Sequence, residues 1–384
     1  MTNSTASIIT AASFFFASSA ALAAGPAPNV VVSIKPVHSL VAGVMEGVGT
    51  PELLIKGNAS PHDFTLKPSD ATNLQNAKVV FWIGEGLEAF LEKPLENLAS
   101  GANAVELMET KGVSTLPYRD LEDFSKHEDH DGHAEHKDHD DHKEHADHKD
   151  HDDHDDHAKK DDHDKDHAKH EDHDDHAEHK DHDDHKEHAD HDDHKEEHAG
   201  HSDHDGHDHH GSEDAHIWLD PVNAKAMVKE IVAVLSKEDP ANKEAYAKNG
   251  VAIEAKLDQL VTDTDKALHD YEDAKYVVFH DAYQYFEKRF HLKPSGVVTL
   301  SPEIQPGAAQ LKELREEISE EKVSCVFSEP QFPSAIPATL VENTSAKVAV
   351  LDPLGSSIEA GPEMYFQLIA SMSASFQDCL SETG

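Results

Sequence analysis

The sequence predicts an α/β protein with two lobes, each holding a mostly parallel sheet flanked by helices, joined by one long helix. Three observations indicate this fold. Apolar strand-like runs alternate with helical stretches of about ten residues in both halves of the chain, which is typical of βα units. A long helical pattern separates the two halves. A polar segment rich in histidine and aspartate interrupts the first half, and we expect this insertion to be disordered.

Residues 1–24 have the pattern of a secretory signal. The run SIITAASFFFASSAALAA ends in the small-residue pattern Ala21-Leu22-Ala23. The preceding residues MTNSTAS contain no lysine or arginine, so an N-terminal membrane anchor is the alternative interpretation. Because the run is short for a membrane span and rich in serine and alanine, we expect the mature protein to be exported and soluble.

The first lobe is predicted from residues 25–126 and from residues 211–240, which follow the insertion. Strands are predicted at 30–35, 52–55, 78–84 and 104–107, and helices at 37–47, 67–77, 86–98 and 221–237. Asp220 followed by Pro221 is a typical helix start, since a capping side chain precedes a first-turn proline. Val222, Met227, Ile231 and Val234 then recur roughly along one side of the last helix.

The linking helix is predicted over residues 241–273, where apolar residues recur at helical spacing without an internal proline. At about 1.5 Å per residue it spans about 50 Å, which is long enough to run from one lobe to the other. The second lobe, 274–384, repeats the alternation. Its strands are predicted at 275–280, 295–300, 323–329 and 346–352, and its helices at 281–290, 307–321, 333–343 and 361–379.

Negative charge is concentrated in the insertion, residues 127–210. The whole chain of 384 residues has a formal net charge of −44, of which the insertion carries −25 and the other 300 residues −19. Binding to phosphates requires clustered lysine and arginine. The composition therefore argues against a nucleic-acid partner.

The insertion holds 28 of the 34 histidines, and over residues 133–157 a histidine stands at every third position. These nine are His133, His136, His139, His142, His145, His148, His151, His154 and His157. Without strong apolar residues the segment cannot offset its ordering entropy, so we expect it to be disordered without metal. Two hypotheses follow. The insertion is either an accessory metal-binding loop that raises the metal concentration near a neighbouring site, or a dispensable acidic loop.

Six histidines lie outside the insertion. They are His38, His62, His216, His269, His280 and His291. His280 ends a predicted strand, as does Asp352, and open α/β sheets bind ligands beyond the carboxyl ends of their strands. Three imidazoles favour Zn²⁺ and also suit Cu²⁺ or Ni²⁺, whereas Mn²⁺ and Mg²⁺ prefer oxygen. His269 and His291 are interpreted as surface residues, and His38 as a polar neighbour of the site.

Cys325 and Cys379 are the only cysteines. In an oxidising compartment, two cysteines far apart in sequence favour a disulfide over a metal-ligand pair. Two free buried thiols are the alternative.

Seven segments carry a resemblance to a known family. In chain order they are SIKPVHSLVAGVMEGV, ASPHDFTLKPSD, HIWLDP, VFHDAYQYFEKRF, SPEIQPG, CVFSEPQF and LDPLG. Together they resemble the ZnuA family, the zinc-binding components of bacterial ABC zinc importers within the cluster A-I metal-binding proteins. The resemblance covers about residues 26–380. It implies a periplasmic protein with one Zn²⁺ in the cleft between two lobes, which a rigid helix joins, and delivery of the ion to an inner-membrane permease.

The resemblance also implies the ligands. The family's histidine ligands fall on His62 and His216 of the first lobe and on His280 of the second. Relatives selective for manganese have a glutamate at the position of His280, which favours zinc here. Some members have a glutamate before the first histidine as fourth ligand, but this chain has Pro61. We therefore expect water at the fourth position, with Asp352 as the alternative.

The sequence thus predicts a monomeric zinc-capture protein that performs no bond chemistry and releases the ion when a small lobe shift detaches His280. The family's late disulfide falls on Cys325 and Cys379. A binding protein for nickel or manganese is the first alternative. A zinc hydrolase is another, with Glu303, Glu329 or Asp352 as general base. A metal-storage or adhesion protein would not need two lobes and a long helix.

Overall fold

The computed structural model describes residues 26–125 and 213–381. These residues belong to one compact unit, Met1–Glu128 with Gly206–Gly384, and a second unit, Asp129–Asp205, lies outside them. The predicted signal sequence at 1–24 and the nine regularly spaced histidines of the insertion also lie outside the described residues. Within the described ranges, no helix combines the length and the hydropathy needed to cross a membrane.

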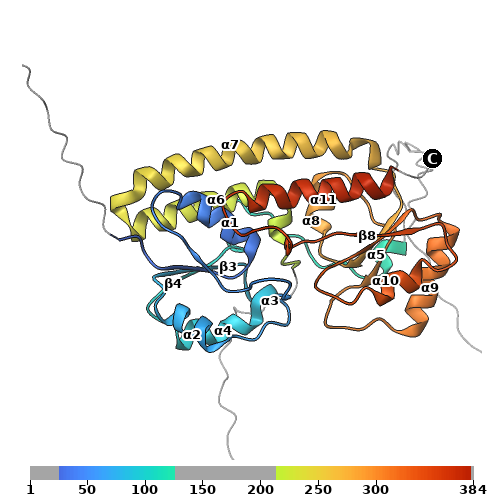
Figure 1. Ribbon diagram of the computed structural model, residues 1–384, viewed down its shortest axis with the longest axis horizontal. Coiled ribbons are helices and arrows are strands. Elements are labelled where there is room, and N and C mark those ends of the chain that lie inside the picture. The colour runs from blue at the N-terminus through green and yellow to red at the C-terminus, as the bar shows by residue number, and fades with distance from the viewer. Residues whose placement is uncertain (1–25, 126–212, 382–384) are drawn as a thin grey trace, which may run out of the picture. The chain divides into compact units, whose positions relative to one another are not determined.

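The first lobe is built on a parallel sheet of four strands in the order β2-β1-β3-β4. The strands are β1 (Val30–Val32), β2 (Glu52–Leu53), β3 (Val79–Trp82) and β4 (Asn103–Glu106). The two central strands, β1 and β3, are wholly apolar and buried, as expected for a parallel sheet covered on both faces. Helices α1 (Lys35–Val44) and α6 (Pro221–Glu238) lie on one side of this sheet, and α2 (Pro68–Gln75), α3 (Glu85–Glu88) and α4 (Glu92–Asn97) on the other (Figure 1).

The second lobe repeats this topology with the order β6-β5-β7-β8, again all parallel. Its strands are β5 (Tyr276–His280), β6 (Gly296–Thr299), β7 (Cys325–Ser328) and β8 (Lys347–Val350). Its helices are α8 (Gln284–Arg289), α9 (Ala308–Glu320), α10 (Ala335–Leu340) and α11 (Met364–Leu380). The strand order reverses between β5 and β7, so a crevice beyond their carboxyl ends is the expected place for a ligand.

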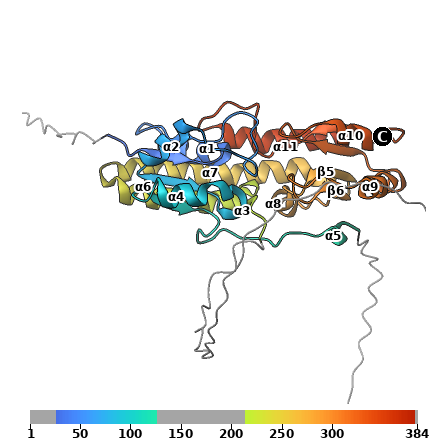
Figure 2. The ribbon, with the colours of Figure 1, turned by 90° about the horizontal axis from the view of Figure 1, so that it is seen from below.

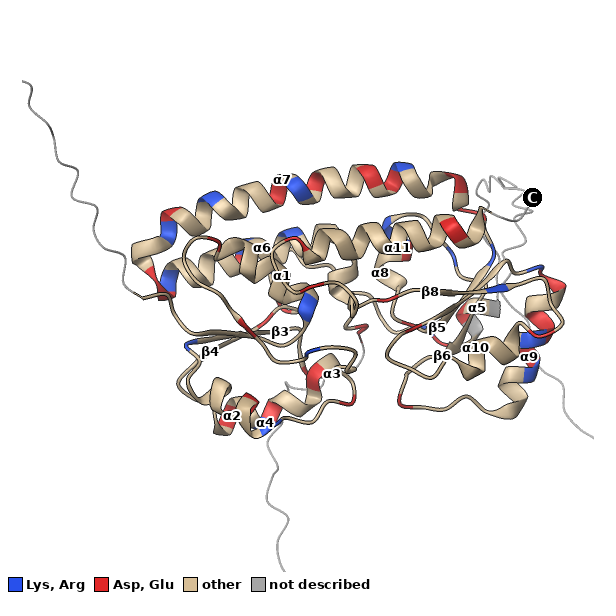
Figure 3. Cartoon of the chain, viewed as in Figure 1, with Lys and Arg blue, Asp and Glu red and all other residues tan. Residues whose placement is uncertain are grey.

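The long helix α7 (Lys243–Leu268) confirms the predicted link between the lobes, and single 3₁₀ turns extend it at both ends. It packs on α6, α1 and α11 and runs along both lobes (Figures 1 and 2). Acidic and basic residues recur along α7 (Figure 3), and most of them are exposed, as on a solvated helix face. Gly250 allows α7 to approach α6 closely, because a Cβ there would lie 2.5 Å from the side chain of Val232.

The helix termini show where sequence patterns succeed and fail. The predicted cap of α6 is confirmed, since the amide of Val222 donates to Asp220 Oδ1 at 2.8 Å. The single helix predicted over 86–98 is wrong: α3 ends at Glu88, and α4 begins at Glu92 after a 3₁₀ turn. Pro94 explains the break, because proline has no N–H for the carbonyl of residue 90 and its ring clashes with that carbonyl in a continuous helix.

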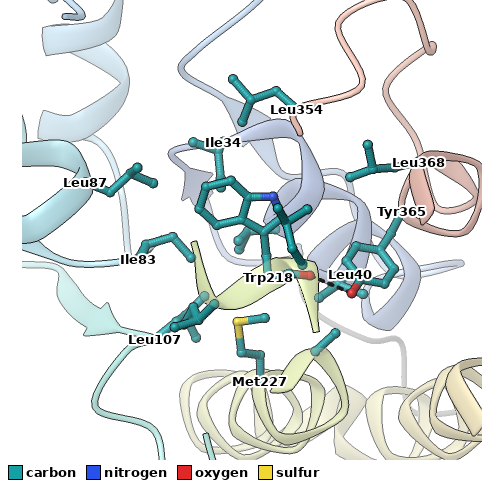
Figure 4. Close-up of a cluster of buried hydrophobic side chains, with 14 of the residues drawn as sticks. Ile34, Leu40, Ile83, Leu87, Leu107, Trp218, Met227, Leu354, Tyr365 and Leu368 are labelled. Atoms are coloured by element: carbon teal, nitrogen blue, oxygen red, sulfur yellow. Dashed lines mark hydrogen bonds between the residues drawn. The ribbon is translucent and has the colours of Figure 1, made fainter. Parts of the chain in front are cut away.

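One apolar cluster contains residues of both lobes, Trp218 among them, and a second, smaller cluster lies within the second lobe. The Trp218 indole N–H donates to the carbonyl of Pro353 at 2.9 Å, and the Tyr365 hydroxyl donates to the Trp218 carbonyl at 2.7 Å. Figure 4 shows side chains from both lobes around this indole, among them Ile34, Ile83, Leu107, Leu354 and Leu368. Trp218, and with it the adjacent stretch of chain, is therefore held by contacts to both lobes.

A second connection between the lobes is made by the segment that leads into the insertion. This segment ends in the short helix α5 (Glu122–Ser125), which packs on β6. Within it, the Arg119 guanidinium pairs with the carboxylates of Asp281 and Glu287, and its Nη2 lies 2.8 Å from Glu287 Oε2. Both acids are buried. Burial raises the pKa of Glu287 to about 7, even though Arg119 acts in the opposite direction.

The predicted disulfide is confirmed and joins β7 to α11. Cys325 and Cys379 have Cα atoms 6.1 Å apart and are separated by 54 residues in sequence. Closing a loop of about 54 residues should stabilise the fold by about 4 kcal/mol, because it restricts the unfolded chain.

We therefore expect the double Cys→Ser variant to lose about that free energy of unfolding in denaturant titrations. A wild-type unfolding midpoint that does not move when reductant is added would contradict this expectation.

Replacing Arg119 by Met should destabilise the fold by about 3–5 kcal/mol at pH 8, because Asp281 and Glu287 would be left buried without a cation. Arg119 lowers the pKa of Glu287, so in the variant that pKa should lie above the wild-type value of about 7. The loss should therefore shrink as the pH falls from 8 towards 7, and stay constant at lower pH, where Glu287 is protonated in both proteins. Thermal unfolding of the metal-free protein measures both effects. Lys225→Met is the control, because Lys225 forms an exposed pair with Asp258 at 2.6 Å and should contribute at most about 1 kcal/mol. If both variants lose the same free energy of unfolding, the buried ion pairs of Arg119 stabilise the fold no more than the exposed pair of Lys225 does.

Candidate metal centre

The structure brings three histidines from distant parts of the chain together. The possible ligand atoms of His62, His216 and His280 all lie within 4.8 Å of one another. The Nε2 atom of His216 is 3.3 Å from Nε2 of His62 and 3.4 Å from Nε2 of His280. Two nitrogens bound tetrahedrally to zinc at about 2.05 Å lie about 3.3 Å apart. The spacing of these atoms therefore fits a tetrahedral zinc ion.

Each histidine is placed by a different element. His280 is the last residue of β5 and lies at the crevice where the order of the second sheet reverses. His216 immediately precedes the 3₁₀ turn Ile217–Leu219, whose Trp218 is anchored between the lobes. His62 lies in the loop between β2 and α2, where its amide donates to the Ser60 hydroxyl at 3.2 Å.

Each imidazole also has a carboxylate beside its Nδ1 atom. The pairs are His216–Asp214 at 2.7 Å, His280–Glu329 at 2.6 Å and His62–Glu303 at 3.6 Å. In the first two pairs Nδ1–H donates to the acid, which leaves the Nε2 lone pair free for a metal. From the sequence, Glu303 and Glu329 were expected only as general bases, and Asp214 was not expected at the site. Its position two residues before His216 was the available signal.

The electrostatics of the cluster favour a bound cation. Burial and then the neighbouring imidazoles lower the pKa of His62 to about 2, so this ring is neutral and able to bind metal. Burial also lowers the pKa of His280, but Glu329 and two further acids outweigh it, and the net shift is upward. Glu329 Oε2 has no hydrogen-bond partner among the described residues. A buried carboxylate oxygen without a hydrogen-bond partner is stabilised by a positive charge placed nearby.

Two cavities meet at the histidines. The smaller, of about 10 Å³, has room for about one water or small ion. It touches all three rings, and its apolar walls include Trp218, Phe332 and Leu354. The larger, of about 380 Å³, is lined by the same rings and by polar side chains, among them Glu85, Tyr118, Arg119, Ser301 and Glu303. The larger cavity therefore reaches all three rings and has room for a hydrated ion.

Asp352, the alternative fourth ligand, does not join the group of possible ligands within the described residues. Its Oδ1 accepts hydrogen bonds from Gln331 Nε2 at 2.9 Å and from the amide of Leu354 at 3.1 Å. Its Oδ2 accepts from the amide and the hydroxyl of Ser356 at 2.6 and 2.7 Å. With both oxygens engaged, Asp352 shapes the loop after β8.

The remaining histidines of the described residues lie outside the cluster. His38 is buried, and its Nε2 is 3.1 Å from the carbonyl of Pro51. His269 and His291 are exposed, as predicted. The histidines of the insertion lie outside the described residues, so their part in metal binding stays a prediction.

Comparison with known proteins points to one family. The family model described as ZnuA, zinc-uptake complex component A, periplasmic, matches residues 30–379. The high-affinity zinc uptake system protein ZnuA of Brucella suis biovar 1 is 43% identical over 359 residues, which cover 94% of this chain and 93% of that protein.

Solved structures agree on the fold. A crystal structure of ZnuA aligns with a TM-score of 0.62 and 18% identity, over 92% of this chain and 99% of the other. A ZnuA deletion mutant with zinc bound aligns with a TM-score of 0.62 and 19% identity, over 93% of this chain and 100% of the other. The chain therefore belongs to the ZnuA family of periplasmic zinc-uptake components.

Proposed function

We propose that this protein captures Zn²⁺ with the Nε2 atoms of His62, His216 and His280 and delivers the ion to the permease of an ABC importer. The observation that carries the proposal is the spacing of 3.3 and 3.4 Å between these Nε2 atoms, with carboxylates on the opposite side of the rings. The names of the relatives support it, since the Brucella suis protein is a high-affinity zinc uptake protein and one structural neighbour binds zinc.

The donor set supports zinc over other divalent ions. All three members of the cluster are imidazoles, and no carboxylate belongs to it among the described residues. Manganese and magnesium prefer oxygen ligands, while nickel and copper prefer square-planar or octahedral surroundings. Three nitrogens at tetrahedral spacing match the preference of zinc.

Water completes the coordination in this proposal. Asp352 is engaged elsewhere, and Pro61 has no donor atom in its side chain. The cavity of about 10 Å³ beside the three rings has room for one water. Such a ligand leaves easily, which suits a protein that must give up its ion.

A binding role also explains the nearby acids better than hydrolysis does. A zinc hydrolase needs a general base that is free to accept a proton from the bound water. Here Glu329 is engaged by His280, Asp352 by the loop after β8, and Glu303 lies beside Nδ1 of His62 on the side away from the metal position. We therefore propose that the centre binds zinc without bond chemistry.

We also propose that the mature protein is a monomer located in the periplasm, and the family description supports the location. The insertion would act as an accessory loop that binds zinc weakly and raises its concentration near His216, to which it is joined in sequence.

Replacing His62, His216 and His280 together by alanine should abolish tight zinc binding, because no other group of three possible ligands exists among the described residues. The measurement is the zinc content per chain after equilibration with a chelator that strips weakly held ions. The wild type should retain one zinc and the variant none. The control replaces the exposed residues His269 and His291 by alanine and should retain one. A triple variant that still retains its zinc would overturn the proposed function.

A further inference from the structure

The three ligand–carboxylate pairs differ in how firmly they are held. The carboxylates of Asp214 and Glu329 are each 1% exposed and bond to their imidazoles at 2.7 and 2.6 Å. The carboxylate of Glu303 is 46% exposed and lies 3.6 Å from Nδ1 of His62, beyond hydrogen-bond range. His62 itself has the most exposed ring of the three, at 14%. One ligand is therefore less constrained than the other two.

Contacts to the second lobe explain why His216 stays with His280. The backbone carbonyl of Asp214, the partner of His216, accepts a hydrogen bond from the Tyr285 hydroxyl at 2.6 Å. Its Oδ2 accepts another from Gln284 at 3.3 Å, and both donors belong to α8. A relative movement of the lobes would therefore separate His62 from the other two ligands. The sequence, by contrast, led us to expect that His280 is the ligand that detaches.

Glu303 belongs to the second lobe, although the histidine beside it belongs to the first. It lies in the loop after β6, and the Thr299 hydroxyl at the start of that loop contacts the carbonyls of Ser301 at 2.7 Å and Ile304 at 2.9 Å. Thr299 in turn pairs with His280 in the sheet. The backbone of the Glu303 loop is thus tied to the strand beside His280, and the Ser301 hydroxyl donates to the Glu303 carboxylate. The distance from Glu303 to His62 therefore depends on how close His62 is to the other ligands.

The distance of 3.6 Å between Glu303 Oε1 and Nδ1 of His62 allows two arrangements, one with and one without a hydrogen bond between them. A shortening of about 0.8 Å would bring Glu303 Oε1 into a charge-assisted hydrogen bond with Nδ1–H of His62. Such a bond would orient the ring and increase the basicity of Nε2. Without it, the His62 ring lacks the carboxylate hydrogen bond that orients the rings of His216 and His280. Because Glu303 also lines the cavity of about 380 Å³, it is reached by solvent and by an approaching ion.

From these contacts we infer that Glu303 is a positioning residue that sets the rate of zinc release by holding or freeing the imidazole of His62. The inference rests on the proposed zinc centre and adds the residue that controls exchange. Glu303 does not act as a ligand, since it faces Nδ1 and the metal position lies on the Nε2 side of the ring.

The test is the zinc dissociation rate of Glu303→Gln in the full chain, measured by stopped flow against excess chelator. Tryptophan emission is the signal, because the ring of Trp218 lies 5.2 Å from that of His216 and neither tryptophan belongs to the insertion. We expect release at least about tenfold faster than in the wild type, within the range found when outer-sphere partners of metal ligands are lost. The variant should still bind one zinc at the centre.

Two controls separate position from charge. Glu316→Gln removes one charge from the same lobe at an exposed residue paired with Lys312, and should release zinc at the wild-type rate. Glu303→Asp keeps the charge but shortens the side chain, so it should release zinc as fast as Glu303→Gln. Wild-type rates in Glu303→Gln or in Glu303→Asp, or equal acceleration in Glu316→Gln, would overturn the inference. If the wild type retains no zinc after equilibration with the chelator, the proposed zinc centre itself is wrong.

Discussion

The metal centre depends on the hydrogen bonds that pair His216 and His280 with buried carboxylates. Hydrogen bonds from Nδ1 of His216 and His280 to buried acids point both Nε2 lone pairs at one position. Lone pairs that face one another at 3.3 and 3.4 Å, next to buried negative charge, favour a cation between them. The free energy spent on burying these acids is recovered when the ion binds, so metal binding and folding stability are linked in this chain.

The contacts between the two lobes restrict how the metal centre exchanges its ion. Trp218 and Arg119 connect the lobes through buried contacts, and Lys35 donates to the carbonyls of Gly355, Ser356 and Ile358 at 3.0, 2.9 and 3.1 Å. A wide opening of the lobes would break all of these contacts at once. Local movement of the His62 loop breaks few of them. Exchange by loop movement is therefore the less costly route, and the exposed Glu303 lies on that route.

The fold was predictable because its signals are local. Alternating apolar runs identified all eight strands of the described residues, and Asp220 with Pro221 marked the start of α6. The centre was predictable only in part. The strand-end rule selected His280, whereas His62 and His216 were assigned by family resemblance, because convergence of separate loops leaves no local pattern. The role of Asp214, the distance from Glu303 to His62 and the hydrogen bonds that engage Asp352 all depend on tertiary packing, which periodicity does not encode.

The most direct test of the central claim is the position of the metal itself. Crystals of the full chain with zinc should be measured at wavelengths on both sides of the zinc absorption edge. We expect an anomalous peak about 2.0–2.1 Å from Nε2 of His62, His216 and His280. Nδ1 of His216 should still donate to Asp214, and Nδ1 of His280 to Glu329. A peak coordinated through Nδ1, or a zinc ion bound by Asp352 in place of one histidine, would contradict this expectation.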